Sequence, residues 1–329
     1  MATVLVTGAT GLTGSNVCLQ LLERGDTARA LVRRPEDAAA LDESGVELVA
    51  GDVTDRRSVV DAAAGCEAVV HAAALLGGAT QDRAEFDAVN LGGTVNVLDA
   101  AELHGLRRVV AFSTGTFFDR TTGVDLEDAP LLEDPPDDPY TASKLAAYLE
   151  VHRRAEGGHD VLTCHPGAIY GPGPVVDRAL ARTSFNRVFQ AALRGRIRRQ
   201  LTNLVSWVTG ADVARGALAA LDHGTPGASY WLVGRSEDRV STAEACNRAI
   251  ALAGLDHHVE EVDPRSDPAG LTEEFGPTLV AVALAAATGG EPPRPAVTRT
   301  MAEIGYDPVP LDEGLEELVR WLRDLGRID

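Results

Sequence analysis

Cysteine is scarce in this sequence, and its placement argues against a disulfide framework and a cysteine-based metal site. The 329 residues include four cysteines, which are widely separated and form no C-x-x-C pair. They are Cys18, Cys66, Cys164 and Cys246. A zinc site, or the disulfide frame of a small secreted protein, would need close and regular spacing or a companion histidine cluster. We therefore expect four reduced cysteines in the interior and no metal ion.

Long apolar runs and an excess of positive charge are also missing. No stretch approaches transmembrane length, and residues 1–3 lead directly into the first predicted strand, which leaves no room for a signal peptide. The net charge is −19, so the surface should repel nucleic acids and anionic membranes. We therefore expect a cytoplasmic protein that binds a small-molecule substrate, with no nucleic-acid partner and no membrane partner.

The most informative stretch that is present is a glycine-rich turn near the start of the chain. The apolar strand 4–6 leads into Gly8, Gly11 and Gly14, and an apolar helical pattern follows over 16–24. Gly8 lets the chain turn sharply, Gly11 lets backbone N–H groups approach a pyrophosphate, and Gly14 lets the helix pack close to the sheet. This context favours a dinucleotide site over a turn with a purely structural role.

The second predicted strand, residues 27–32, ends in two arginines. An acidic side chain at this place binds the ribose 2′-OH of NAD, whereas an arginine suits the 2′-phosphate of NADP. Arg33 and Arg34 follow the strand directly, and no acidic residue competes with them at the strand end. We therefore predict NADP as the cofactor, with NAD as the alternative. The other interpretation is that the two arginines are an ordinary basic pair beside a helix and have no role in binding the cofactor.

The first half of the chain alternates strands with helices. Further short apolar strands are predicted at residues 46–50, 68–70, 109–112 and 161–164. Such alternation is typical of a parallel sheet covered on both faces. We therefore predict an α/β fold, a Rossmann-type doubly wound parallel sheet with a smaller C-terminal substrate lobe. The nucleotide-binding domain is expected to span 1–174 and to include 201–235, and the substrate lobe to span 175–200 and 236–329.

Other segments are expected to be helix, lid or linker. One helix spans about 83–104, where Gly92 and Gly93 indicate close backbone packing or a local bend. Another spans 176–199 and carries a basic cluster of Arg194, Arg196, Arg198 and Arg199. That cluster either binds an anionic substrate or forms a solvated helix face. Residues 263–288 and the Gly-Gly-Glu-Pro-Pro run that follows are expected to be lid and linker.

Candidate catalytic groups gather near the middle of the chain. Ser113 and Thr114 follow a predicted strand, at the end where ligands bind in an open parallel sheet. Tyr140 and Lys144 are four residues apart on a predicted helix, so their side chains share one face. A nearby ammonium, together with a nicotinamide cation, favours phenolate and lowers the pKa of the tyrosine. By itself, however, this pair is also common on solvated helix faces.

In combination, these motifs resemble the extended short-chain dehydrogenase/reductases, also called the NAD-dependent epimerase/dehydratase family. The resemblance covers about half of the chain. The matching segments, in family order, are 7–14, Gly51-Asp52, 71–74, Asn90 with Gly93-Thr94, Ser113-Thr114, 140–144 and 166–172. Later segments at 211–214, 304–308 and 312–315 are also similar to the family.

The resemblance implies a role for each matching residue. Tyr140 would be the general acid/base, and Lys144 would bind the nicotinamide ribose while tuning Tyr140. Thr114 would hydrogen-bond the reacting oxygen, and Asn90 would support the lysine side of the site. The residues implied to border the cofactor are Gly8, Thr10, Gly11, Leu12, Gly14, Arg33, Arg34, Asp52, Val53, Ala72, Ala73, Ala74, Lys144, Pro166, Gly167 and Ile169.

Departures from the family pattern reduce the range of substrates that we expect. Residues 115–116 are Gly-Thr where sugar-nucleotide dehydratases have Asp-Glu, and Ala168 stands where sugar-nucleotide epimerases usually have a diphosphate-binding asparagine. The segment 165–168 looks more like the dihydroflavonol-reductase and hydroxysteroid-dehydrogenase side of the family, whose substrates are less polar carbonyls or alcohols. Phe117-Phe118 replaces the usual Val-Tyr, and Tyr148 replaces a common glutamate. These replacements would either reshape the site or have no effect on function.

These features predict an NADP(H)-dependent oxidoreductase that interconverts a carbonyl and an alcohol of a small metabolite. The alternative is a sugar-nucleotide epimerase with internally recycled NAD(P). In that enzyme the arginines at 194–199 would bind the anionic substrate. A lesser alternative is a non-catalytic dinucleotide-binding regulator, although such proteins commonly lose the Tyr/Lys pair. The resemblance also implies a homodimer formed through the helices that hold Asn90 and Tyr140.

Overall fold

A parallel sheet forms the centre of the molecule. The computed structural model describes residues 1–120, 122, 124–276, 280, 283–284 and 296–328. Within these residues the sheet has seven strands in the order β10-β6-β5-β4-β1-β2-β3, and every neighbouring pair is parallel. They are β1 (Thr3–Thr7), β2 (Thr27–Val32), β3 (Glu47–Ala50), β4 (Ala68–His71), β5 (Arg108–Phe112), β6 (Val161–Pro166) and β10 (Ser229–Leu232). This order confirms the predicted Rossmann-type fold.

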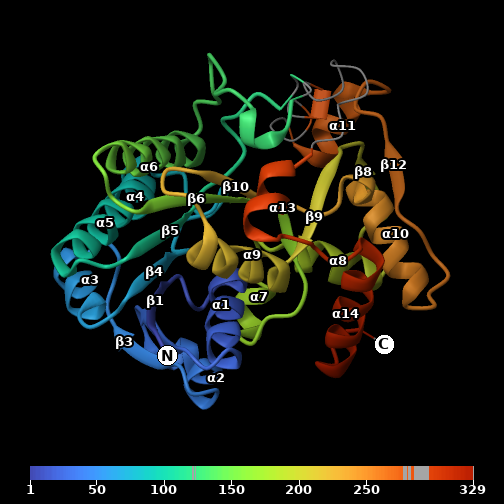
Figure 1. Ribbon diagram of the computed structural model, residues 1–329. Helices are drawn as coiled ribbons and strands as arrows, with labels where there is room; N and C mark the ends of the chain where they lie inside the picture. Colours follow the sequence, from blue (N-terminus) through green and yellow to red (C-terminus); the bar gives the residue numbers. More distant parts are fainter. Residues whose placement is uncertain (121, 123, 277–279, 281–282, 285–295, 329) are drawn as a thin grey trace.

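Helices cover both faces of the sheet (Figure 1). One face carries α1 (Leu12–Glu23) and α9 (Gly210–His223), and the other carries α3 (Arg56–Ala63), α5 (Gly93–His104) and α6 (Pro139–Glu156). Each face has its own apolar core because successive strand residues point to opposite sides. Val4 and Val6 pack in the core with α1, whereas Leu5 packs in the core with α3.

The predicted helix at 83–104 contains a π-helical turn. It begins as α4 (Arg83–Phe86), passes through the π-helical segment Asp87–Gly92 and continues as α5. A Cβ at Gly93 would lie 3.0 Å from a methyl carbon of Val53, so the glycine allows close packing against the loop after β3. The π-helical segment carries Asn90, and such segments are frequent at functional sites.

The second half of the chain adds two small sheets and a second apolar core. The sheets contain β7 (Ala168–Tyr170), β9 (Val205–Thr209) and β11 (Arg239–Val240), and β8 (Arg199–Leu201) with β12 (Glu260–Val262). The remaining helices are α2 (Ala39–Glu43), α7 (Val176–Ala179), α8 (Phe185–Leu193), α10 (Thr242–Leu252), α11 (Pro268–Phe275), α13 (Thr298–Ile304) and α14 (Leu311–Asp324). α8, α10 and α14 contribute apolar side chains to the second core.

The single helix predicted over 176–199 is wrong. The structure has the separate helices α7 and α8, because Ser184 caps α8 by accepting a hydrogen bond from the Asn186 backbone N–H. Arg199 belongs to β8 and pairs with Glu260, a contact that is distant in the sequence. The segment at 263–288 includes α11, while the Gly-Gly-Glu-Pro-Pro run lies outside the described residues.

Two expectations from composition can be compared with the structure. All four cysteines are buried and free. Among the helices that the structure describes, none is long and apolar enough to cross a membrane.

Candidate active site

A groove of about 660 Å³ runs along the edge of the sheet where the parallel strands end. This is the edge at which open α/β sheets bind ligands. The groove is lined by nearly all of the predicted site residues, namely Gly8, Thr10, Gly11, Leu12, Gly14, Arg33, Asp52, Val53, Ala72, Ala73, Ala74, Thr114, Tyr140, Lys144, Pro166, Gly167 and Ile169. Arg34 and Asn90 are not among its lining residues and lie next to others that are.

The glycine-rich turn at one end of the groove fits a pyrophosphate. Gly8 has a φ of 71°, and a Cβ there would lie 2.5 Å from the backbone nitrogen of Ala73. A Cβ at Gly14 would overlap the carbonyl oxygen of Gly8. At Gly11 a Cβ would meet only that oxygen, at 3.3 Å, within the described residues. The turn therefore requires glycine for its own shape and leaves backbone open toward the groove at the start of α1.

Lys144 lies in the groove on α6, near the end of β5. The helix begins at Pro139, and Asp138 caps it by accepting a hydrogen bond from the Thr141 backbone N–H at 2.9 Å. The Lys144 ammonium donates to the carbonyl oxygen of Phe112 at 2.6 Å. Burial lowers the pKa of Lys144 to about 8. Lys144 is the only lysine of the whole sequence, so no other side chain can duplicate its amine.

Tyr140 lies one helical turn before Lys144 and shares the groove with Thr114. Burial raises the pKa of the Tyr140 phenol, the hydrogen bond with the Thr114 side chain lowers it, and the charge of Asp138 raises it. The pKa of Tyr140 is therefore raised in the protein by itself, whereas the sequence led us to expect a lowered value. The expectation included a nicotinamide cation, and without that charge the desolvation of the phenolate dominates.

Asn90 and His71 form a buried polar network behind the groove. Asn90 exchanges hydrogen bonds with the backbone of Leu75, at 2.8 and 3.2 Å, and donates to the Ser143 hydroxyl at 2.9 Å. It therefore fixes both the loop after β4 and the residue before Lys144. The His71 ring contacts the Thr7 hydroxyl at 2.7 Å and the Thr94 hydroxyl at 3.1 Å. Burial, followed by the charge of Lys144, lowers the pKa of His71 to about 3, so this ring stays neutral.

His165 also supports the site, and its role was not evident from the sequence. Its Nδ1 lies 3.0 Å from the carbonyl oxygen of Thr114, and its Nε2 lies 3.1 Å from the Thr163 hydroxyl. The ring stacks on Trp231 with centroids 5.1 Å apart and meets the edge of Phe118 at the same distance. Burial lowers the pKa of His165 to about 3. A neutral imidazole thus holds the backbone of the site threonine.

The two aromatic departures from the family pattern pack against one another. Phe117 and Phe118 contact Tyr148 with ring centroids 5.3 and 5.5 Å apart. Trp231 joins this cluster, and a Cβ at Gly115 would lie 2.6 Å from its ring. Gly115 therefore stands after the site threonine because the indole occupies the space that a larger side chain would need.

The other end of the groove is bordered by arginine. Arg33 is exposed, lines the groove and has no ion-pair partner among the described residues. Arg34 instead donates to Asp37 at 2.6 Å. Asp52 accepts hydrogen bonds from the backbone and hydroxyl of Thr54, both at 2.9 Å. The basic cluster at 194–199 is absent from the described lining of the groove, and Arg199 pairs with Glu260 and Glu274.

Comparison with known proteins decides the family. The sequence model of the NAD dependent epimerase/dehydratase family matches residues 4–234. This chain belongs to that family. Members of the family are enzymes that use a nicotinamide dinucleotide, which confirms the predicted enzyme class and the general type of cofactor.

Three relatives are similar to this chain over half of its length or more. Sterol demethylase protein B of Methylococcus capsulatus is 36% identical over 233 residues, covering 70% of each chain. The 3 beta-hydroxysteroid dehydrogenase/Delta 5-->4-isomerase of Mycobacterium tuberculosis is 33% identical, and the match covers 59% of this chain and 52% of that protein. The dTDP-4-dehydro-6-deoxy-D-allose reductase of a Streptomyces species is 30% identical, with coverage of 98% and 96%. The hydroxysteroid-dehydrogenase likeness predicted from the sequence is confirmed.

Two further parts of the groove are the hydroxyl of Ser113, which the sequence placed at the end of a strand, and an apolar surface, which the sequence did not predict. Ser113 has a buried hydroxyl that borders the groove and has no hydrogen-bond partner within the described residues, so it is free to bind a ligand. Leu75, Leu76 and Phe185 add apolar surface, and Phe185 comes from the second half of the chain. None of the family-like segments named above includes Phe185, so only the folded structure assigns it to the groove.

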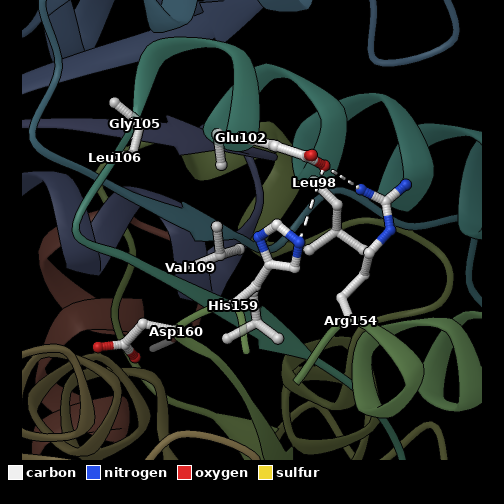
Figure 2. Close-up of a pocket in the computed structure, with 10 residues that line it drawn as sticks. Leu98, Glu102, Gly105, Leu106, Val109, Arg154, His159 and Asp160 are labelled. Atoms are coloured by element: carbon white, nitrogen blue, oxygen red, sulfur yellow. Dashed lines mark hydrogen bonds and ion pairs between the residues drawn. The ribbon is translucent and has the colours of Figure 1, made fainter. Parts of the chain in front are cut away.

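A second, smaller hollow lies at the opposite edge of the sheet, where β5 and β6 begin (Figure 2). Its volume is about 200 Å³. Figure 2 shows Glu102 directed toward two basic side chains, at 3.1 Å from Arg154 and 3.9 Å from His159. The Glu102 carboxylate and the Arg154 guanidinium of this hollow are thus paired with one another, and the hollow lies at the edge of the sheet opposite to the one where Rossmann-type sites bind ligands.

Proposed function

We propose that this enzyme transfers hydride between NADP(H) and a carbonyl or alcohol of a small, moderately apolar metabolite. The observation that carries the proposal is the convergence of Thr114, Tyr140 and Lys144 in one groove with the glycine-rich turn. A purely structural helix face would not bring all of these groups to the edge of the sheet where ligands bind.

The side chains of the groove divide the work of carbonyl reduction. A bound nicotinamide would supply the hydride to the carbonyl carbon. The Tyr140 hydroxyl donates its proton to the carbonyl oxygen, so the product is an alcohol and the phenol becomes phenolate. Thr114, which is bonded to the same phenol, holds the carbonyl oxygen beside it. The Lys144 ammonium stabilises the phenolate by its charge, and Phe112 and Asn90 keep the lysine segment in place.

The preference for NADP rests on Arg33. Its guanidinium borders the groove at the end of β2, where the 2′-substituent of the adenosine ribose binds in this fold. An exposed guanidinium without an acidic partner is suited to a phosphate and gives no advantage for a ribose hydroxyl.

A moderately apolar substrate is supported by exposed apolar side chains that line the groove. Leu76 and Phe185 line the groove while remaining 48% and 38% exposed. Relatives whose names include a sterol or a hydroxysteroid point in the same direction. The close contact of Gly115 with Trp231 leaves no space for the acidic pair of dehydratases, which argues against dehydration.

The first experiment follows the absorbance of reduced nicotinamide. The enzyme is mixed with NADPH, and separately with NADH, in the presence of a panel of aldehydes, ketones and sugar nucleotides. Net oxidation of NADPH with a carbonyl compound is the expected result. Conversion of a sugar nucleotide to its epimer without net oxidation would replace the proposal by the epimerase alternative. Binding of NADPH with no turnover of any substrate would favour the non-catalytic regulator.

We also propose a homodimer formed through α5 and α6. Leu103 on α5 and Leu149 on α6 are 62% and 50% exposed, so each of these neighbouring helices presents a large apolar side chain to solvent. Light scattering after size exclusion should give twice the chain mass of 34.6 kDa. Replacement of both leucines by glutamate should return the mass to that of one chain.

A further inference from the structure

One arginine from the second half of the chain reaches the end of β2. Arg178 lies on α7, and its Nη2 donates to the Oδ2 atom of Asp37 at 3.0 Å. Arg34 donates to the same oxygen atom at 2.6 Å. Asp37 belongs to the 3-10 turn Pro35–Ala38, which follows Arg33 and Arg34 directly. Two guanidinium groups that are far apart in the sequence therefore meet at a single carboxylate oxygen.

The position of Arg178 is fixed relative to the groove. The loop before α7 packs on the helix that follows the glycine-rich turn, because Asn16 donates to the carbonyl oxygen of Pro172 at 3.2 Å. A Cβ at Gly173 would lie 2.8 Å from a methyl carbon of Leu12. Both Arg178 and Arg33 line the groove, so arginines from its two walls border the adenosine end.

Three guanidinium groups lie at this end of a chain whose net charge is −19. Arg34 and Arg178 both donate to Asp37, whereas Arg33 lines the groove without an ion-pair partner among the described residues. The acidic side chains Glu36, in the same turn, and Asp52, in the groove lining, also lie at this end. The arginine hydrogen bonds also keep the pKa of the Asp37 carboxyl below its usual value, with Arg34 contributing more than Arg178. A phosphate monoester near pH 7 carries close to two negative charges and accepts several guanidinium hydrogen bonds.

We propose that Arg178 completes a 2′-phosphate site for NADP(H) that Arg33 and Arg34 begin. This assignment rests on the proposed NADP preference and adds to it a ligand from the second half of the chain. The bond between Arg178 and Asp37 holds the guanidinium at the end of β2 before the cofactor binds. The phosphate then shares the arginines with Asp37, and its binding connects the wall made by α7 to the wall made by β2.

The test compares two small ligands that differ by the phosphate in question. Isothermal titration calorimetry measures the affinity of adenosine 2′,5′-bisphosphate and of adenosine 5′-monophosphate for the complete chain. The variants are Arg178→Gln, Arg33→Gln and the matched control Arg187→Gln, an exposed arginine in the same half of the chain and outside the described lining of the groove. The Arg178 side chain is 40% exposed, so its replacement should leave the fold intact.

We expect Arg178→Gln to weaken the bisphosphate about tenfold, the usual effect of losing one charged hydrogen bond, and to leave the monophosphate unchanged. Arg178→Lys should recover part of the loss, and Arg187→Gln should have no effect. Equal weakening of both ligands would mean that Arg178 acts at the 5′-phosphate, which would overturn the assignment. An unchanged bisphosphate affinity would overturn it as well.

The same titrations separate this assignment from the proposed cofactor preference. If Arg33→Gln weakens the bisphosphate while Arg178→Gln does not, the NADP preference stands and only the role of Arg178 is lost. If the unmodified protein binds the bisphosphate no more tightly than the monophosphate, the NADP preference itself fails, and the Arg178 site fails with it.

Discussion

The groove and the hollow of Figure 2 lie at opposite edges of the same sheet, and their charged side chains differ in whether they are paired with a charge of opposite sign. In the groove, Lys144 donates to the backbone carbonyl of Phe112, and Arg33 has no ion-pair partner among the described residues. In the hollow, Glu102 lies 3.1 Å from Arg154 and 3.9 Å from His159, so acid and base face one another. Charged groups are present at both places, but only the groove leaves them available to a ligand.

This difference teaches that concavity alone does not mark the active site of this fold. The hollow lies where β5 and β6 begin, and the groove lies where the strands end. In the groove, the close packing of Gly8 and Gly14 exposes backbone, and burial shifts the pKa of both Tyr140 and Lys144. Shifted ionisation together with open backbone is typical of a site built for chemistry. The predictions below test this contrast.

The largest effect is expected from Tyr140→Phe in the groove. Loss of the proton donor should reduce kcat for carbonyl reduction by about 10²- to 10⁴-fold, the usual contribution of general acid catalysis. Tyr148→Phe is the matched control, because it makes the same chemical change on the same helix in the aromatic cluster. Steady-state kinetics should find Tyr148→Phe close to the unmodified enzyme. Similar losses of kcat in the two variants would contradict the role of Tyr140 as the proton donor.

The next effect concerns the ionisation of Lys144. Its pKa of about 8 in the folded protein lies below the 10.5 of a free lysine, so the unfolded chain binds more protons between these values. The contribution of Lys144 to stability should therefore increase as the pH rises from about 8 to about 10. Relative to Lys144→Met, the free energy of unfolding should gain about 2 kcal/mol over this range. Chemical denaturation at several pH values measures the difference.

The single lysine also permits a direct titration. Isotopically labelled lysine gives one side-chain NMR signal in this chain, since no other lysine is present. We expect its midpoint near pH 8 in the protein without cofactor. A midpoint near that of free lysine would contradict the burial that distinguishes the groove from the hollow.

A smaller effect is expected from His165, which holds the backbone of Thr114 without facing the reacting atoms. His165→Leu leaves the Thr114 carbonyl without its partner and should lower the free energy of unfolding by about 1–3 kcal/mol. His165→Asn restores a donor near the position of Nδ1 and should recover most of kcat. If His165→Leu loses stability while kcat is unchanged, His165 supports the fold only.

The smallest effect is expected in the hollow. Glu102→Gln should change stability by less than about 0.5 kcal/mol, because the Glu102 side chain is 56% exposed and Arg154 keeps its ion pairs with Asp99 and Glu150. Its kcat/KM should equal that of the unmodified enzyme. A clear loss of turnover in this variant would contradict the claim that only the groove takes part in catalysis.

The sequence predicted those features that depend on local pattern. The strand, glycine turn and helix at residues 3–23 were evident because apolar spacing and glycine placement act over a few residues. The helix predicted at 176–199 failed because β8 is set by pairing with β12, which lies 61 residues further along the chain. The aromatic packing of Phe118, Tyr148 and Trp231 was equally inaccessible, since it brings together three distant segments.

Prediction of the candidate site from the sequence was limited in the same way, because contacts between distant segments were not evident. The site residues predicted from family motifs nearly all line the groove, whereas other lining residues such as Leu76 and Phe185 were not predicted. The sequence predicted a lowered pKa for Tyr140, whereas in the protein by itself this pKa is raised, because the folded chain removes water from the phenol. Arg178 could not be placed at the end of β2 either, since its contact with Asp37 spans 141 residues of the sequence.

The measurement that tests the central claim most directly follows the hydride itself. NADPH carrying deuterium at nicotinamide C4 is incubated with the enzyme and a ketone that it accepts, and the product is examined by mass spectrometry. We predict an alcohol with one deuterium on the former carbonyl carbon, formed in equal amount to oxidised cofactor, and almost no such product with Tyr140→Phe. Product without deuterium, or equal yields from the two proteins, would contradict the assignment of the groove as a Tyr140-dependent hydride-transfer site.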